Sequence, residues 1–450
     1  MWTGDGGGQR GGTPQGLSRR GFLHGATATA GLLTLGQGHR VRTVTAQTDG
    51  LPAPEDSGIE HIVWVMMENR SFDHFLGWLP GAHGQQARLT YPDRMGVMQP
   101  TYRLAPDFQG CGHPDPDHSY LGSRMAYHDG AVDGWLQTGA NDTYAIGYYT
   151  DADLAFLGQA APAWTVCDHY FASVMGESFP NRLHQHCAQT DRLRNTDTLT
   201  TLPTIWDRLA DARLEGRYYF SDAPFLGLWG TKYLSMTRPF AAFLFDALTD
   251  QLPQVAFVEP RFIDNASGTS GDDHPVADIR NGEAFLALVY TAITRSPAWG
   301  RTVLVITYDE WGGFFDHVPP PERPLPAADV AAGATDGLLG FRVPCLLIAP
   351  SAPADVAHSV FDHTSVLRLI EWRWQLRPLT IRDETATNLA EALDFSMPRR
   401  TTPQFDVPLG PFGGPCDSVT AVAAEHWHRL LALAQDVAHR IKIPLIKLGR

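Results

Sequence analysis

Two short apolar runs, each ending abruptly in acidic and amide side chains, limit what this chain can fold into. Residues 62–67 and 303–307 are too short for long helices and are rich in β-branched and large side chains, as buried strands are. Oxygen-bearing side chains follow at once: Glu68 and Asn69 after the first run, Asp309 and Glu310 after the second. In open α/β sheets, ligands bind at the carboxyl ends of the strands. The sequence therefore predicts an α/β fold with a site at that edge of the sheet.

These four residues also predict a bound metal ion. One such pair could simply cap the next helix, but capping is a poor explanation for the same pattern at two strands. Carboxylates that meet at a partly dry strand end repel one another, and a divalent cation is the usual remedy. We expect one divalent ion held by Glu68, Asn69, Asp309 and Glu310. All-oxygen ligation favours Ca²⁺, Mg²⁺ or Mn²⁺, with Zn²⁺ as an alternative.

The two stretches resemble a known superfamily. Residues 68–74 read ENRSFDH, and residues 308–321 read YDEWGG followed by FDHVPPP. Both resemble motifs of the bacterial phosphoesterase superfamily, which includes secreted phospholipases C and acid phosphatase A type enzymes. The resemblance extends from about Ile59 to Trp374. It implies a three-layer α/β/α sandwich around a largely parallel sheet, similar to alkaline phosphatase.

Ser178 is the candidate nucleophile. From the residues alone, Ser178 just before Pro180 looks like the start of a helix, and capping would explain it. The amides at such a start also favour a bound anion. The superfamily places its nucleophilic Ser or Thr before a Pro-Asn-Arg segment, which implies that role for Ser178. Arg182 lies one helical turn later and is expected to reach a bound oxyanion.

Histidines are expected to complete the site. The resemblance implies roles for His274, which precedes Pro275 and a Gly-Glu helix, and for His118 in a proline-stiffened loop. Either would protonate the leaving group. His317 and Arg182 are further candidates for holding phosphoryl oxygens. His113 is a weaker candidate, and His363 is expected to be structural.

The resulting expectation is phospholipase C-like hydrolysis of a phosphodiester through a phosphoserine intermediate. The substrate would be a phospholipid or a small phosphoester. An acid phosphatase is the first alternative, since Ser at position 178, in place of Thr, is closer to that side of the superfamily. A sulfatase is a second, because Ser178 to Arg182 fits S-x-P-x-R, although His184 to His186 replaces its Leu-Thr-Gly continuation. An inactive exported metal- or lipid-binding protein is a third.

The N-terminus predicts export. Residues 1–46 contain Arg19-Arg20, a mildly apolar run and a small-residue site at residues 44–46, and so resemble a twin-arginine signal. We expect passage through the twin-arginine machinery to the periplasm, cell envelope or medium. A catalytic domain is expected over residues 57–400, with a linker and a helix over 401–450 packed on it. No run reaches the roughly 18 apolar residues of a membrane anchor.

Composition excludes some partners. The 35 Lys and Arg against 49 Asp and Glu give a net charge of −14 at pH 7, which argues against nucleic acid and offers no polybasic membrane patch. The five cysteines show no C-x-x-C spacing, so a zinc cluster is not expected. One or two disulfides are possible in an exported protein, and the sequence leaves their pairing open.

Overall fold

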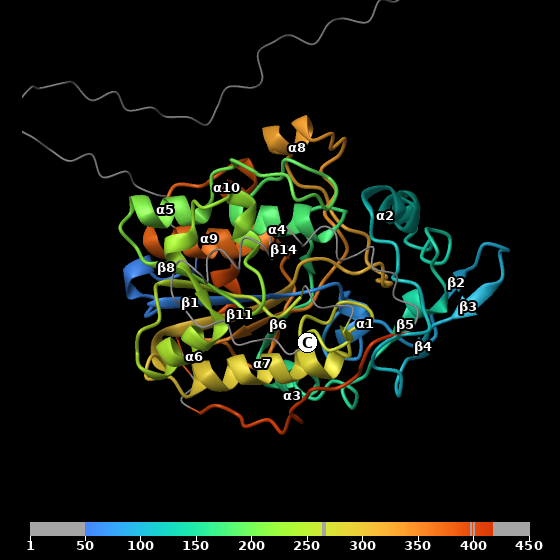
Figure 1. The fold of residues 1–450 in the computed structure, drawn as a ribbon, viewed down its shortest axis with the longest axis horizontal. Coiled ribbons are helices and arrows are strands. Elements are labelled where there is room, and N and C mark those ends of the chain that lie inside the picture. Colours follow the sequence, from blue (N-terminus) through green and yellow to red (C-terminus); the bar gives the residue numbers. More distant parts are fainter. Residues whose placement is uncertain (1–49, 263–266, 397, 399–400, 417–450) are drawn as a thin grey trace, which may run out of the picture. The chain divides into compact units, whose positions relative to one another are not determined.

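An eight-stranded sheet forms the centre of the molecule (Figure 1). The computed structural model describes residues 50–262, 267–396, 398 and 401–416. The strand order is β13-β6-β12-β11-β1-β10-β8-β9. The strands are β1 (His61–Met67), β6 (Thr165–Cys167), β8 (Gly216–Phe220), β9 (Thr237–Pro239), β10 (Val255–Val258), β11 (Thr302–Tyr308), β12 (Cys345–Ile348) and β13 (Val356–Ala357). All neighbours are parallel except that β12 is antiparallel to both β11 and β6. The predicted largely parallel sheet is confirmed.

The two apolar runs of the sequence are adjacent strands. β1 and β11 pair in parallel over their full length, and Met67 lies opposite Tyr308. Both strands are buried, apart from the partly exposed first residue of β1, which explains their continuous apolar sequence. Because the strands run in the same direction and end in register, the residues that follow Met67 and Tyr308 emerge together at one edge of the sheet.

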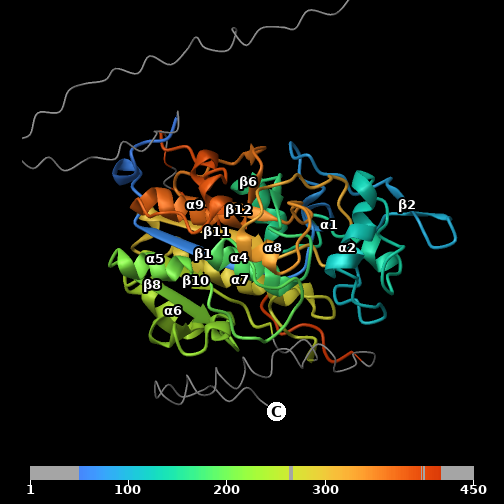
Figure 2. The same ribbon diagram turned by 90° about the horizontal axis from the view of Figure 1, so that it is seen from above.

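Helices cover both faces of the sheet, as the prediction of a three-layer sandwich requires (Figures 1 and 2). One face carries α4 (Ser178–Cys187), α5 (Ile205–Asp211), α9 (His363–Trp374) and α10 (Ile381–Glu384). The opposite face carries α3 (Leu157–Ala160), α6 (Phe240–Leu248) and α7 (Ile279–Thr294). Further short elements lie outside the main sheet: α1 (Phe72–Leu76), α2 (Tyr120–Tyr127), α8 (Ala327–Ala331), β2 (Thr90–Pro92), β3 (Met98–Pro100), β4 (Tyr102–Arg103), β5 (Gly147–Tyr148), β7 (Tyr170–Phe171) and β14 (Phe361–Asp362).

The helix predicted at Ser178 is α4. Glu177 is its N-cap residue, with extended backbone and no capping side-chain hydrogen bond, so Ser178 is the first helical residue. Pro180 falls in the first turn, where its missing N–H costs no helical hydrogen bond. The Ser178 hydroxyl is therefore not used as a helix cap and remains available for chemistry.

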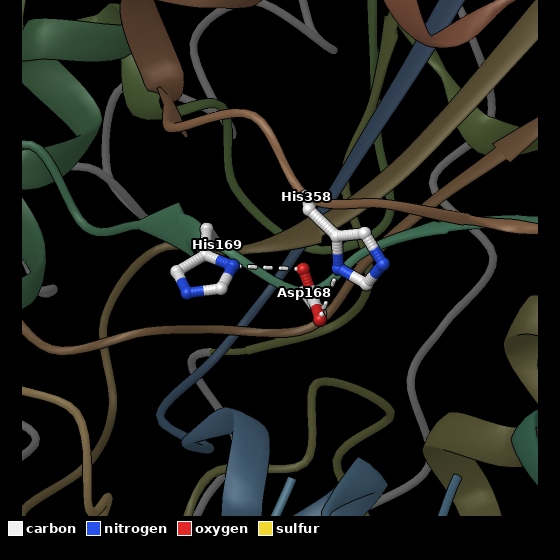
Figure 3. A group of neighbouring side chains, drawn as sticks. All are labelled: Asp168, His169 and His358. Carbon is white, nitrogen blue, oxygen red and sulfur yellow. Dashed lines mark hydrogen bonds and ion pairs between the residues drawn. The ribbon is translucent and has the colours of Figure 1, made fainter. Parts of the chain in front are cut away.

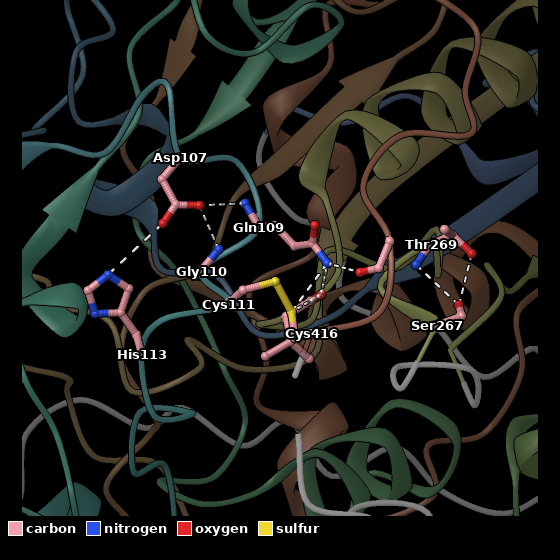
Figure 4. Close-up of a disulfide and its surroundings, with 10 residues drawn as sticks. Asp107, Gln109, Gly110, Cys111, His113, Ser267, Thr269 and Cys416 are labelled. Atoms are coloured by element: carbon pink, nitrogen blue, oxygen red, sulfur yellow. Dashed lines mark hydrogen bonds and ion pairs between the residues drawn. A yellow bond between two sulfur atoms is a disulfide. The ribbon is translucent and has the colours of Figure 1, made fainter. Parts of the chain in front are cut away.

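A disulfide joins two distant parts of the chain, Cys111 and Cys416, whose Cα atoms lie 5.2 Å apart (Figure 4). Residues 401–416 contain no helix or strand but are fixed along α7. Asn281 both donates to the carbonyl of Phe412 and accepts from its amide, and the Tyr290 hydroxyl donates to the carbonyl of Pro403. Cys167, Cys187 and Cys345 are free and buried. The helix expected within residues 401–450 and the twin-arginine segment at residues 1–46 lie outside the described residues.

Candidate active site

The four predicted metal ligands lie together where β1 and β11 end. We call Glu68, Asn69, Asp309 and Glu310 the oxygen cradle. All four are buried. The Asp309 carboxylate accepts a hydrogen bond from the amide of Asn69 at 3.2 Å, and the amide of Arg70 donates to the carbonyl of Glu310 at 3.1 Å. Residues 240 positions apart are thus joined by hydrogen bonds at a single edge of the sheet.

Asn69 adopts a backbone conformation that few residues tolerate. Its φ is 60°, in the left-handed region, where Asn is among the better-accepted residues. Facing it is Gly312, where a Cβ atom would come within 2.2 Å of the Asn69 carbonyl oxygen. Such conformations concentrate at functional sites, where the surrounding structure holds them. The Asn69 side chain lies towards Ser178, whose Oγ is 3.5 Å from Asn69 Oδ1.

Ser178 points into the same region. Its Oγ donates to Asn69 Oδ1 over 3.5 Å, a long hydrogen bond, from the first turn of α4. The residue is buried, and the positive end of the helix dipole lies beside it. The structure therefore brings the predicted nucleophile to the predicted metal ligands.

Arg182 binds carboxylates of the protein itself. Its guanidinium donates to Glu68 at 2.8 Å, to Asp309 at 3.1 Å and to Glu259 at 2.6 Å, and the side chain is only 1% exposed. These three bonds involve all three guanidinium nitrogens. The geometry thus supports a role that differs from the expected contact with a substrate oxyanion: Arg182 fixes two members of the oxygen cradle.

The oxygen cradle carries more negative charge than its neighbours compensate. Burial raises the pKa of Glu68 despite the opposing effect of Arg182, and burial with the Glu68 charge raises the pKa of Asp309 to about 6. The pKa of Glu310 lies well above its usual range, chiefly because of burial. Glu310 Oε1 and Asn69 Nδ2 have no hydrogen-bond partner among the described residues. Buried acids with a free oxygen fit a hard divalent cation.

One histidine, His118, lies beside the oxygen cradle, and His274, from a separate loop, lies next to His118. His118 Nε2 is 3.8 Å from Glu310 Oε1, and the rings of His118 and His274 are 6.5 Å apart between centroids. In each ring Nδ1 contacts a backbone carbonyl, of Pro116 or Pro275, which favours a proton on Nδ1. Burial lowers the pKa of His274. Burial would also lower that of His118, but Glu310 and Asp115 overcome this and raise it to about 10.

The other candidate histidines lie elsewhere. His317 contacts Asp73 at 2.5 Å and His83 at 3.3 Å, and none of its contacts with described residues is to the oxygen cradle. His113 contacts Asp142 and stacks on Tyr144. His363 is buried, and its Nε2 contacts the Asp309 carbonyl at 2.7 Å, in keeping with the expected structural role.

Sequence reasoning missed two acids at the site, Glu259 and Asp272. Glu259 follows β10, which pairs with β1, so an acid directly after a buried strand was the available signal. Asp272 accepts from Ser270 Oγ at 2.7 Å and from the His274 amide at 3.2 Å, while its second oxygen has no partner in the described part of the chain. Burial and the Glu68 charge raise the pKa of Asp272 well above its usual range. No periodicity in residues 271–275 would have revealed this.

A largely parallel sheet with a buried serine and an acidic cradle at its carboxyl edge is an arrangement suited to the hydrolysis of esters. The chain belongs to the phosphoesterase family, whose model matches residues 59–377. Its relatives include phospholipase C B of Mycobacterium tuberculosis, 32% identical over 436 residues, covering 78% of this chain and 80% of the relative. Non-specific phospholipase C1 of Arabidopsis thaliana is 30% identical over 409 residues, covering 80% and 76%. Phospholipase C A of Mycobacterium tuberculosis is 28% identical over 473 residues, covering 88% of each chain.

The solved structures to which the chain is similar are more distant. A protein in the alkaline phosphatase superfamily from Vibrio parahaemolyticus is 10% identical with a TM-score of 0.38, covering 87% of this chain and 89% of that one. The lipoteichoic acid synthase LtaP of Listeria monocytogenes is 7% identical with a TM-score of 0.42, covering 88% and 96%. In the part of the chain that the structure describes, no helix is long and apolar enough to cross a membrane.

Proposed function

We propose that this phosphoesterase is an exported, divalent-metal-dependent phospholipase C that releases diacylglycerol and a phosphorylated head group. The observation that carries the proposal is the position of Ser178 Oγ, within 3.5 Å of Asn69 in a cradle of buried carboxylates. The names of the relatives support a phosphodiester as substrate. Glu68, Asn69, Asp309 and Glu310 would hold the ion, which when bound lowers the pKa of the serine hydroxyl and offsets charge on the phosphoryl oxygens.

Side chains of the protein supply the nucleophile, the general acid and the general base. Ser178 Oγ loses its proton to solvent and attacks phosphorus, the bond from phosphorus to the diacylglycerol oxygen breaks, and cationic His118 gives that oxygen a proton. Water then attacks the phosphoserine and loses its proton to neutral His274, the bond from phosphorus to Ser178 breaks, and the seryl oxygen takes a proton from solvent. His274 then releases its proton to solvent and His118 regains one, which restores the starting state. The position of His118 Nε2, 3.8 Å from Glu310 Oε1, supports a place for it beside the reacting groups. Arg182 acts indirectly, by orienting Glu68 and Asp309.

Export by the twin-arginine route is the second part of the proposal. It rests on the Arg19-Arg20 pair with the apolar run behind it and is supported by the disulfide between Cys111 and Cys416, since structural disulfides persist mainly in oxidising compartments. Transport of a folded protein also suits an enzyme that acquires its metal before crossing the membrane.

Turnover of three substrates tests the chemistry. Wild type, Ser178→Ala and the matched control Ser296→Ala, a buried serine outside the site, are assayed on phosphatidylcholine, bis-p-nitrophenyl phosphate and p-nitrophenyl phosphate, with and without chelator. We expect Ser178→Ala to lose at least roughly 10³-fold in kcat on the diesters, and chelator to abolish wild-type activity.

Other results would change the assignment. Full activity of Ser178→Ala removes the nucleophile, and activity that survives chelation removes the metal. Preference for the monoester makes the protein a phosphatase, and absence of turnover with retained metal or lipid binding makes it a binding protein. Intact mass identifies formylglycine, and with it a sulfatase, by the loss of two hydrogens at Ser178.

A further inference from the structure

A group of histidine and aspartate side chains, residue types that can bind metal ions, lies away from the oxygen cradle. Four segments that are distant in the sequence bring together His83, His169, His317 and His358, which we call the histidine cluster. His83 and His358 are exposed, and the other two are partly exposed. None of the four has a hydrogen bond or ion pair to the oxygen cradle or Ser178 among the described residues, and the proposed reaction does not use them.

Buried carboxylates bind the Nδ1 atoms of three residues of the histidine cluster. Asp168 accepts from His169 Nδ1 at 2.8 Å through one oxygen and from His358 Nδ1 at 2.9 Å through the other (Figure 3). Asp73 binds His317 Nδ1 at 2.5 Å. A carboxylate on Nδ1 places the proton there and leaves Nε2 as a lone pair, which is the arrangement that orients metal-binding imidazoles in proteins.

The other ring nitrogens of His169 and His317 face the two ring nitrogens of His83. His83 Nδ1 lies 3.3 Å from His169 Nε2, and His83 Nε2 lies 3.3 Å from His317 Nε2. With its Nδ1 proton on Asp168, His169 presents a lone pair on Nε2, so its contact with His83 Nδ1 needs a proton or a cation between the two nitrogens. A neutral imidazole carries one N–H and can satisfy only one of the two contacts.

The side of His83 that faces His169 is the better place for a cation. Arg342 forms ion pairs with Asp73 and Asp316 and lies 3.5 Å from His317 Nδ1, so positive charge already occupies the His317 side. The carboxylate of Asp168 forms its ion pairs with His169 and His358 alone in the described chain, and Arg342 bonds only to its backbone carbonyl.

The spacing of the two nitrogens matches a tetrahedral metal. Zinc binds imidazole nitrogens at about 2.0–2.1 Å, which separates two tetrahedral ligands by about 3.3–3.4 Å. We propose that His83 Nδ1 and His169 Nε2 bind one transition-metal ion of the zinc, nickel or copper class, with Asp168 holding His169 in place and water completing the coordination. Imidazole selects such ions, whereas the all-oxygen cradle selects Mg²⁺, Ca²⁺ or Mn²⁺, so the two sites differ in preference.

Copper titration of the folded protein tests this inference independently of activity. Protein saturated with Mg²⁺ is titrated with Cu²⁺ and followed by electron paramagnetic resonance, in which nitrogen ligands split the signal, and by calorimetry. We expect one tight Cu²⁺ per chain in wild type, with affinity weakened at least 10-fold in His83→Ala and in His169→Ala. His128→Ala is the matched control, because His128 is also exposed and paired with an aspartate, Asp133.

Two outcomes overturn the proposal: wild type without a nitrogen-coordinated Cu²⁺, or both cluster variants binding Cu²⁺ as wild type does. Equal thermal melting of the variants and wild type in Mg²⁺ alone shows that the substitutions leave the fold intact. Glu310→Gln separates the sites: it should leave Cu²⁺ binding unchanged, whether or not the proposed phospholipase activity is correct.

Discussion

Arg182 donates to Glu68 at 2.8 Å and to Asp309 at 3.1 Å, so one buried guanidinium joins the ends of the two central strands. Removing one partner of a buried ion pair leaves uncompensated charge and typically costs about 3–5 kcal/mol. Arg182→Met should therefore melt at a lower temperature than wild type and bind Mg²⁺ more weakly. Arg182→Lys should recover only part of the stability, since an ammonium group cannot reproduce the planar arrangement of guanidinium nitrogens that donate to the three carboxylates. Calorimetry measures both, and an Arg182→Met variant with wild-type melting and Mg²⁺ affinity would contradict this role.

The leaving group should distinguish His118 from His274. A departing alkoxide needs a proton, whereas p-nitrophenolate is a good leaving group without one. His118→Gln is expected to lower kcat on phosphatidylcholine by roughly 10²–10⁴-fold and to affect bis-p-nitrophenyl phosphate much less. His274→Gln should slow both substrates alike. His113→Gln, on the same loop as His118 but paired with Asp142, is the control. Equal losses of His118→Gln on both substrates would exclude it as the general acid.

Metal removal should destabilise the protein in a pH-dependent way. The pKa of Asp309 is about 6 in the folded protein without an ion and about 4 in an unfolded chain. As pH rises from about 4 to about 6, the unfolded chain has released this proton while the folded one retains it, so stability of the chelated protein falls. Melting temperatures with Mg²⁺ and with chelator should therefore diverge over this range. Asp309→Asn should show a smaller divergence, and a gap independent of pH would contradict the explanation.

Glu371 is expected to destabilise the protein at alkaline pH. It is buried on α9, and burial together with neighbouring Asp383 raises its pKa to about 10. The unfolded chain ionises near pH 4.3, so above that value the folded state bears a growing cost up to about pH 10. Glu371→Gln should raise the melting temperature at pH 8 by at least roughly 2–4 °C, and the gain should vanish towards pH 4. The exposed Glu384→Gln serves as control.

The disulfide should contribute measurable stability. Cys111 and Cys416 are 305 residues apart in the sequence, and the bond ties residues 401–416, which lie along α7, to the loop that contains Cys111. Replacing both by serine should reduce the free energy of unfolding by about 2–4 kcal/mol, measured by urea denaturation. Adding a reductant should destabilise wild type by a similar amount. It should leave the double variant unchanged, because Cys167, Cys187 and Cys345 are already free. Identical unfolding curves for wild type with and without reductant would contradict this contribution.

The local sequence pattern was sufficient to predict the two central strands and the site residues that follow them. The β-branched runs before Glu68 and Asp309 predicted two buried strands, and adjacent parallel strands must deliver their following residues to one edge. The helix at Ser178 was visible for a similar reason, since Pro180 favours a first turn.

Other residues depended on contacts that no local pattern records. Arg182 lies one turn after Ser178 and was expected to face the substrate, but the acids that end β1, β10 and β11 surround its guanidinium. Asp272 joined the site through a loop without regular structure. His317 belongs to the same sequence motif as Asp309, residues 308–321, yet its side chain contacts Asp73 and lies in the histidine cluster.

The sequence by itself determined that acids follow two buried strands and that a serine begins a helix, because hydrophobic periodicity and turn chemistry act over a few residues. Only the tertiary structure decided which groups meet: the Arg182 guanidinium between Glu68 and Asp309, His118 beside Glu310, the pairing of Cys111 with Cys416 and the assembly of the histidine cluster. Coulombic and desolvation energies depend on distances between atoms, and in a folded chain those distances are set by residues far apart in the sequence.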